Sequence, residues 1–298
     1  MNKSGPAIGP IACVTVAASD LAAVEACYAD FLGYRTVGRG SLEAELARLW
    51  DCPRAAGSKY LLMAPERGDD FVFRFIQSPA SSRYTAFASH GWNAAELIVR
   101  NVDALAERLS DSPFRVVGAP QNLSFSDDIR AMQVVGPGGE LLYLTEIKRA
   151  VPGLDAPQVR CDVDRVFIVI LGGPSMSVLQ NFYAEKFGVE PAPAVESRVK
   201  GMSAAFGFSP EHKYPIAALK LAGQSLIEVD EMPAEAEARM AAEGLLPPGI
   251  AMVSFVGASG DASGEPQAQL APPPYRGRCR AGFMSGPTAE KIEILAPV

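Results

Sequence analysis

The stretch 11-IACVTVAASDLAAVEACYADFLGY-34 encodes a strand, a turn and a helix in succession. Residues 11–17 alternate between faces and are rich in β-branched side chains, which predicts a strand. Ser19 or Asp20 can cap the helix that follows, and Gly33 stands where a helix commonly ends in the left-handed conformation. The apolar side chains of this helix recur at helical spacing on one face: Leu21, Val24, Tyr28 and Phe31.

The same pattern returns in the second half, at 163-VDRVFIVILGGPSMSVLQNFYAEKFG-188. A strand-like run again precedes a helix, for which Ser175 is the predicted cap and Gly188 the predicted end. The halves also close alike, with GPGGELLYL at 136–144 and GPTAEKIEI at 286–294. Each closing segment is a Gly-Pro turn followed by a strand, so the chain contains one unit twice.

Between these ends each half holds further strand-like segments: 59–63, 71–75 and 96–99 in the first, and 217–221, 225–229 and 251–256 in the second. A second helix is predicted at 102–109. A polar, proline-bearing linker at 149–162 separates the halves, which predicts domains at 1–150 and 151–298. The Gly- and Ser-rich stretch 257–264, with prolines at 272–274, is predicted to be a surface loop where the first half has its second helix.

Composition excludes several classes of protein. The 298 residues carry a formal net charge of -7 without a run of Lys or Arg, so we expect neither a nucleic-acid nor an anionic-membrane partner. No apolar stretch approaches the ~20 residues of a membrane span, and the N-terminus lacks the apolar core of a signal peptide. The five cysteines are widely spaced without a CxxC pair, which favours free thiols in the cytoplasm over a disulfide framework.

The duplicated unit resembles the vicinal oxygen chelate superfamily, which includes glyoxalase I, extradiol dioxygenases, methylmalonyl-CoA epimerase and bleomycin-resistance proteins. The resemblance lies in the opening strand-turn-helix unit, which reads SDL and LG in the first half and PSM and FG in the second, and in the closing Gly-Pro turn and strand, which begin GPGGE and GPTAE. It implies an α+β fold of tandem βαβββ modules that form two paired, cup-shaped mixed sheets, with one glyoxalase-like domain at 1–150 and another at 151–298.

Enzymes of this family hold one divalent metal in a cleft, where it acts as a Lewis acid on the substrate. The resemblance assigns the ligand positions to the opening, half-module and closing strands of the two halves: Cys13 and Arg165, Ala94 and Met252, Tyr143 and Glu293. Only Glu293 has the family's ligand type. Arg165 would repel a cation, and a site in the first half would need Cys13, Glu96, Tyr143 and His90, in a chain with two histidines.

We therefore expect no cofactor, with a divalent Fe, Mn, Zn or Ni ion as the alternative. Arg165 could replace the metal as a fixed positive charge for a carboxylate or an enolate oxygen. Glu293 could move a proton across the cleft, which would suit a lyase or an isomerase acting on an organic acid or an aromatic catabolite. The alternative is that Arg165 and Glu293 form a structural ion pair in a vacated pocket.

Other residues are candidates for substrate contacts. Tyr143 could donate a hydrogen bond or pack in the core, and Glu228 is an acid within an apolar strand that could point into the cup. The remaining candidates for substrate binding are Trp92, Glu96, Met252 and Arg198. Trp92 could instead belong to the core, and Arg198 could alternate with Lys200 on a solvated strand face. His212 is expected in a surface loop.

Two further functions stay open at this point. One is a non-catalytic protein that binds a small molecule, as the bleomycin-resistance branch does. The other is a metal-dependent dioxygenase or glyoxalase. All three alternatives have a small molecule as the partner, and a homodimer is compatible with the resemblance.

Overall fold

The computed structural model describes residues 7–81, 84–123, 126–257, 268–270 and 279–297. Within these ranges, no helix has the length and apolar character that crossing a membrane requires. The predicted loop at 257–264 and the prolines at 272–274 lie outside the described residues, apart from Gly257, which ends a strand.

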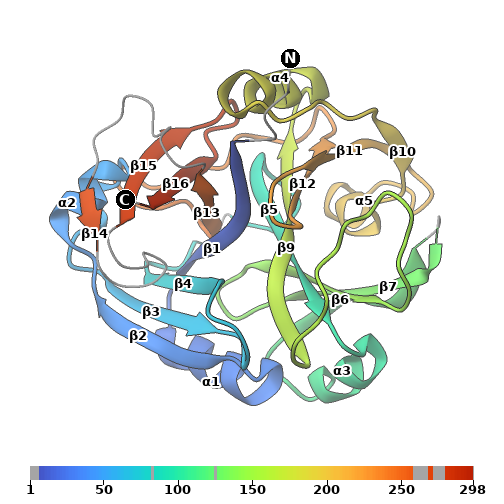
Figure 1. Ribbon diagram of the computed structural model, residues 1–298, viewed down its shortest axis with the longest axis horizontal. Helices are drawn as coiled ribbons and strands as arrows, with labels where there is room; N and C mark the ends of the chain where they lie inside the picture. Colours follow the sequence, from blue (N-terminus) through green and yellow to red (C-terminus); the bar gives the residue numbers. More distant parts are fainter. Residues whose placement is uncertain (1–6, 82–83, 124–125, 258–267, 271–278, 298) are drawn as a thin grey trace.

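The described strands form two eight-stranded mixed sheets, which lie side by side in Figure 1. Sheet 1 has the order β14 (Ala268–Leu270), β15 (Cys279–Ser285), β16 (Lys291–Pro297), β13 (Gly249–Gly257), β1 (Ile8–Ala18), β4 (Val72–Gln77), β3 (Lys59–Ala64), β2 (Arg35–Ser41). Sheet 2 has the order β10 (Val195–Ser197), β11 (Tyr214–Lys220), β12 (Leu226–Glu231), β9 (Val163–Gly173), β5 (Gly91–Val99), β8 (Leu141–Ile147), β7 (Ser126–Val135), β6 (Arg115–Leu123). We call their concave faces cup 1 and cup 2.

The pairing of the central strands joins the two halves of the sequence. β1 runs antiparallel to β13 in sheet 1, and β5 runs antiparallel to β9 in sheet 2. Each sheet therefore takes four strands from each half, and both cups are completed within one chain. The division at 1–150 and 151–298 separates the two copies of the sequence repeat. That these two segments are separate domains stays a prediction.

The helices are α1 (Leu21–Leu32), α2 (Ala44–Leu49), α3 (Val102–Leu109), α4 (Met176–Phe187) and α5 (Lys200–Phe206), with a short 3-10 turn at Pro53–Ala55. The predicted ends of the two repeated helices are confirmed. Asp20 accepts hydrogen bonds from the first turn of α1, and Ser175 accepts one from α4. Gly33 and Gly188 end these helices with φ of 70° and 63°, a conformation that favours glycine.

The alternation of side chains along the central strands produces two kinds of apolar core. Val14 and Val169 belong to the main core, which also contains the buried faces of α1, α3 and α4. The alternate residues face the cups, where smaller apolar clusters lie. The predicted α+β fold of tandem βαβββ modules in two cup-shaped mixed sheets is thus confirmed.

Two helices differ from the sequence prediction, and the strands β2, β6, β7 and β15 were not predicted either. Lys200 begins helix α5 and does not share a strand face with Arg198, since β10 ends at Ser197. The helix forms because Val199 and Met202 bury their side chains against cup 2, and Gly207 ends it with φ of 69°. Helix α2 was not predicted, and it lies over cup 1 through the buried residues Leu46, Ala47 and Trp50.

Candidate functional site

The floor of cup 1 is set by strand register. Cys13 lies opposite Ser254, and Thr15 lies beside Arg74. Ser254 in turn lies beside Glu293 of β16. These five side chains alternate with residues of the main core, so they face the cup.

Cup 2 has the same register with other residues. Ile168 lies opposite Glu96, and Ile170 lies beside Glu228. Glu96 in turn lies beside Tyr143 of β8. The counterparts are therefore Ile168 for Cys13, Glu96 for Ser254, Glu228 for Arg74 and Tyr143 for Glu293.

This register corrects the predicted place of Arg165, which is three positions before Ile168, the counterpart of Cys13. Arg165 lies at the start of β9, where its guanidinium forms an ion pair with Asp70 at 3.0 Å. Glu293 belongs to the other sheet and pairs with Arg74. The predicted pairing of Arg165 with Glu293 is therefore wrong, because the predicted alignment of the two opening strands was displaced by three residues.

Cup 1 contains a buried and fully engaged ion pair. The Arg74 guanidinium lies 2.9 Å from Glu293, and both side chains are buried. Arg74 also donates to the Thr15 hydroxyl at 2.9 Å. Glu293 accepts further hydrogen bonds from the Ser254 hydroxyl at 2.5 Å and from the Trp50 indole at 3.1 Å. A buried pair of this kind is stable only when its remaining donors and acceptors are satisfied, as here.

The residue after α2 covers this ion pair. Trp50 is fully buried, and the Arg74 guanidinium stacks 4.3 Å from the centre of its ring. The Lys291 ammonium donates to the Trp50 carbonyl at 2.7 Å, which holds the indole in place. Burial raises the pKa of the Cys13 thiol to about 11, so this thiol is protonated and unreactive. The floor of cup 1 is therefore covered by a side chain of the protein itself, that of Trp50.

Cup 2 carries three acids and no equivalent of Arg74. Glu96 comes from β5, while Glu228 and Asp230 share one face of β12 because they are two residues apart. Glu96 and Asp230 are buried, and Glu228 and Tyr143 are partly exposed. The middle of cup 2 is thus acidic and is reached from solvent at Glu228 and Tyr143.

The protonation of these acids differs from that of ordinary carboxyl groups. Burial raises the pKa of both Glu96 and Asp230 to about 7. Burial, with the neighbouring charges of Asp230 and Glu96, raises the pKa of Glu228 well above its usual range. Burial and the same three acids raise the pKa of Tyr143 well above 10, so this phenol stays a neutral hydrogen-bond donor.

Asp230 is the most unusual of the group. Its side chain is 1% exposed, and neither carboxyl oxygen has a hydrogen-bond partner among the described residues. Buried polar groups are nearly always hydrogen-bonded, so an orphaned carboxyl group at a cup floor points to a ligand. Sequence reasoning missed Asp230, although its place two residues after Glu228 on the same strand was visible.

Apolar side chains bound cup 2 at both ends. At one end α5 and the segment before β5 contribute Met202 and Phe87, which pack with Ile170. The Phe87 ring also meets Tyr143 edge-on, with ring centres 6.3 Å apart. At the other end Ile168 and Leu226 pack with the linker between the halves. The cup therefore combines apolar walls with a few convergent polar groups, as small-molecule sites do.

The other residues predicted for substrate contact lie elsewhere. Trp92 is buried in the core between the sheets, where its indole donates to the Lys291 carbonyl at 2.9 Å. Met252 is buried in cup 1. Arg198 is exposed and pairs with Glu211 at 2.8 Å. Of the candidates named from the sequence, Glu96, Tyr143 and Glu228 meet in cup 2, while Glu293 and Met252 lie in cup 1.

The two histidines do not join these groups. His90 is half-buried before β5, and burial with the charge of Arg239 lowers its pKa. His212 is exposed and its ring lies against Phe208 and Tyr214. Arg74, which the sequence reading overlooked, was signalled by a charged residue in the apolar strand 71-FVFRF-75.

The residues of the cups fit a divalent metal poorly. In cup 1 the Arg74 guanidinium is hydrogen-bonded to Glu293, the one predicted ligand of the family's type. In the described part of the chain, no three His, Cys, Asp or Glu side chains converge closely enough to hold one ion. We therefore route no chemical step through a metal, and the expectation of an enzyme without a cofactor stays a prediction.

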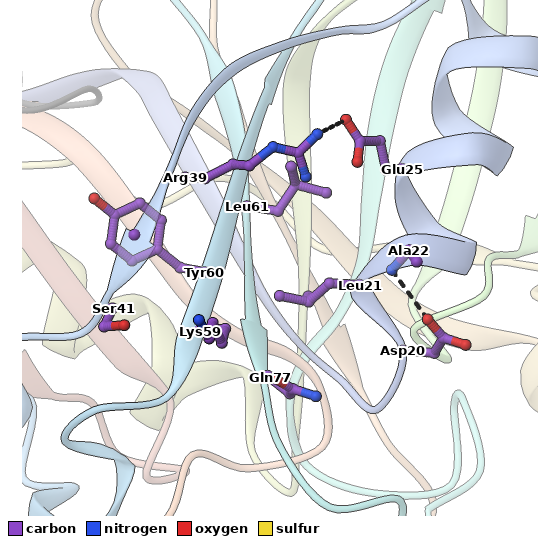
Figure 2. A pocket seen from close by; sticks show the side chains of 11 residues that line it. Asp20, Leu21, Ala22, Glu25, Arg39, Ser41, Lys59, Tyr60, Leu61 and Gln77 are labelled. Carbon is purple, nitrogen blue, oxygen red and sulfur yellow. Dashed lines mark hydrogen bonds and ion pairs between the residues drawn. The ribbon is translucent and has the colours of Figure 1, made fainter.

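A surface hollow of about 590 Å³ lies between the start of α1 and the strands β2 and β3. Figure 2 shows Arg39 bound to Glu25 and Asp20 bound to the backbone of Ala22, while no interaction is marked for Lys59. Arg39 pairs with Glu25, and Asp20 caps α1. Because its acids and its arginine are already engaged, we assign no function to this hollow.

Comparison with known proteins supports the fold. No family model and no curated protein matches the sequence. Glyoxalase I from Zea mays matches the structure with a TM-score of 0.63 at 13% identity, over 96% of this chain and 92% of that one. A putative dioxygenase from Bacillus subtilis subsp. subtilis str. 168 matches with a TM-score of 0.63 at 13% identity, over 98% of this chain and 86% of that one.

At such low identity these similarities establish the fold and leave the reaction open. They extend over nearly the whole chain, so they include both sheets and both cups. The fold that the resemblance to the vicinal oxygen chelate superfamily implied is therefore confirmed at the level of structure: the chain has the fold seen in glyoxalase I and in this putative dioxygenase.

Proposed function

We propose that the protein is an enzyme that moves a proton beside a carbonyl group of a small molecule bound in cup 2, as an isomerase or a lyase does. The observation that carries this proposal is the pair of buried acids, Glu96 and Asp230, whose pKa values are both about 7. An acid with such a pKa is partly ionised at neutral pH, so it can both accept and donate a proton.

Each polar group of cup 2 has a role in this scheme. Glu96, in its ionised form, removes the proton from carbon. Asp230 or Glu228, in its protonated form, returns a proton to the product or to the leaving group. Tyr143 is a neutral donor beside Glu96, and it stabilises the negative charge that develops on the carbonyl oxygen. Glu293 and Arg165, the acid and the charge predicted from sequence, are engaged with Arg74 and Asp70.

The substrate class differs from the sequence-based expectation. An organic acid would bring a carboxylate beside three acidic side chains, and neighbouring like charges repel. The acidity of cup 2 therefore favours a neutral or positively charged carbonyl compound. The apolar walls favour a hydrocarbon or aromatic part.

Deuterium exchange tests this proposal without knowledge of the product. The full chain would be incubated in D₂O with a panel of small ketones, aldehydes and aromatic carbonyl compounds, and loss of C–H signals would be followed by proton NMR. We expect at least one compound to exchange with the native protein. Glu96→Gln should slow that exchange by about 100-fold or more, the usual contribution of a general base.

Matched variants separate chemistry from folding. Glu107→Gln makes the same substitution on the exposed face of α3, outside cup 2, and should leave exchange unchanged. Exchange that persists in the Glu96→Gln/Asp230→Asn double variant would contradict the proposal. Saturable binding of a compound that never exchanges would favour the alternative, a binding protein of the bleomycin-resistance type.

A further inference from the structure

We propose that the small molecule bound in cup 2 carries a cationic nitrogen, an ammonium or amidinium group, which Glu228 and Asp230 hold. This inference deepens the proposed function and rests on cup 2 being the ligand site. It follows from the placement of the charges in the two cups, from the orphaned carboxyl group of Asp230, and from the shape of the walls.

The two cups neutralise their acids differently. In cup 1 the one acid, Glu293, is paired with Arg74 at 2.9 Å. In cup 2 the position of Arg74 is taken by Glu228. The strand position that carries a cation in cup 1 therefore carries an acid in cup 2. The pair Glu228 and Asp230 thus lacks the positive charge that the protein provides at the equivalent place.

Two of the basic side chains around cup 2 bind other partners, and a third lies at the end of a strand. Lys200 of α5 donates to Gln121 at 2.9 Å, and Arg198 pairs with Glu211. Lys220 shares one face of β11 with Ala218, the residue beside Glu228. Lys220 is exposed and ends β11, where it lies beside Leu226. Among the described residues, no arginine or lysine contributes to the altered pKa of Glu96, Glu228 or Asp230.

Asp230 shows that the cation has to come from outside. A buried carboxyl group without a partner is costly, because burial removes its hydration and gives nothing in return. Both of its oxygens lack a hydrogen-bond partner among the described residues. A ligand N–H group that enters the cup would satisfy them and would also neutralise Glu228.

The walls indicate an organic cation. Met202 and Phe87 at one end, and Ile168 and Leu226 at the other, provide apolar contact for a hydrocarbon part. Tyr143 lies beside the acids, and the face of an aromatic ring attracts a cation. Solvent reaches Glu228, since its side chain is partly exposed and Ala218 beside it is exposed. A bare metal ion would use none of these apolar surfaces.

Three probes with the same ring test this inference by isothermal titration calorimetry on the full chain at neutral pH: benzylammonium chloride, benzyl alcohol and sodium phenylacetate. We expect benzylammonium to bind about tenfold or more tightly than benzyl alcohol, as one charged hydrogen bond contributes that much. Phenylacetate should bind most weakly. Protons should be released when benzylammonium binds, as seen by titration in two buffers with different ionisation heats, because a cation favours the ionised acids.

Variants of Glu228 and Asp230 test whether these two acids bind the ammonium group. Glu228→Gln and Asp230→Asn should each weaken benzylammonium binding by about tenfold and change benzyl alcohol binding little. Glu107→Gln should change neither. Equal affinity for the three probes, a preference for phenylacetate, or no binding of benzylammonium at millimolar concentration would overturn the inference.

The failure of this inference can be told apart from the failure of the proposed function. Deuterium exchange that depends on Glu96, in a protein that does not prefer benzylammonium, would reject the cationic substrate and keep the proton transfer. A preference for benzylammonium that depends on Glu228 and Asp230, in a protein that exchanges no compound, would support the cation site and reject the proton transfer.

Discussion

The Tyr28 hydroxyl donates a 2.8 Å hydrogen bond to the buried Glu140 carboxyl group. Its counterpart in the repeat, Tyr183, donates to Glu290 at 3.3 Å. Each tyrosine comes from the helix after one sheet's central strand, and each glutamate follows the Gly-Pro turn that leads into the other sheet. The residues that make the repeat visible in the sequence therefore contact each other, and they tie the two sheets together twice.

Removal of one tyrosine hydroxyl should weaken this tie. Tyr28→Phe leaves a Glu140 oxygen without its donor, and we expect the free energy of unfolding to fall by about 1–2 kcal/mol. Tyr183→Phe should have a similar or smaller effect, because its hydrogen bond is longer. Urea unfolding followed by circular dichroism measures both. Unchanged stability in both variants would show that these contacts do not join the sheets.

The ion pair of cup 1 should be structural. Arg74→Met leaves Glu293 buried without its cation, and we expect a loss of about 3–5 kcal/mol. The double variant Arg74→Met/Glu293→Gln removes both charges and should recover most of that loss. Thermal unfolding of the two variants measures the difference. Equal destabilisation of the single and double variants would contradict a role based on charge pairing.

Deuterium exchange in the cup 1 double variant supplies a second test. Because the chemistry is assigned to cup 2, the rate of deuterium exchange should remain within about twofold of the native rate under conditions in which the variant is folded. A loss of more than 100-fold with intact folding would move the site to cup 1.

The acids of cup 2 should make stability depend on pH. The pKa of Asp230 is raised to about 7 in the folded chain and takes its ordinary value when the chain unfolds. Folding therefore favours the protonated acid, so stability is greatest below the ordinary pKa and falls as the pH rises through about 7. Asp230→Asn cannot ionise and should lessen the fall between about pH 5 and pH 8 by roughly 1–3 kcal/mol. Urea unfolding at both pH values tests this, and an identical fall in the variant would refute it.

Metal content separates the proposed chemistry from the family's metal-dependent reactions. Protein purified without a histidine tag and without added metal should contain much less than one equivalent of Fe, Mn, Zn or Ni by elemental mass spectrometry. The physical reason is that Arg74 binds Glu293 in cup 1, while among the described residues no three His, Cys, Asp or Glu side chains form a group that could hold one metal ion. Near-stoichiometric metal that disappears in Glu228→Gln would contradict this prediction.

Much of the fold could be predicted because its signals are local. The cap at Ser175 and the left-handed glycines Gly33 and Gly188 fix the helix ends within a few residues. The repeat then supplied the architecture. The pairing of β1 with β13 and of β5 with β9 could not be predicted, since it joins residues more than 60 positions apart and leaves no mark in the sequence of either strand.

The site was only partly predictable, because it depends on that pairing. Glu96, Tyr143 and Glu228 were each named individually, but Glu228 lies on a strand of the other half, so their meeting in one cup was not predicted. An alignment that was three residues out on β9 put Arg165 in the place of Ile168. Since alternate residues face opposite sides of a sheet, such an error moves a side chain out of the cup.

The most direct test of the central claim is the titration of the cup 2 acids by carboxyl-detected carbon-13 NMR of the full chain, with Glu96→Gln and Asp230→Asn used to assign the signals. We expect the carboxyl resonances of Glu96 and Asp230 to move with midpoints near pH 7, as those of acids that exchange protons at neutral pH would. Midpoints close to the ordinary values of about 4 would show two permanently ionised carboxylates, and would contradict a proton-transfer site in cup 2.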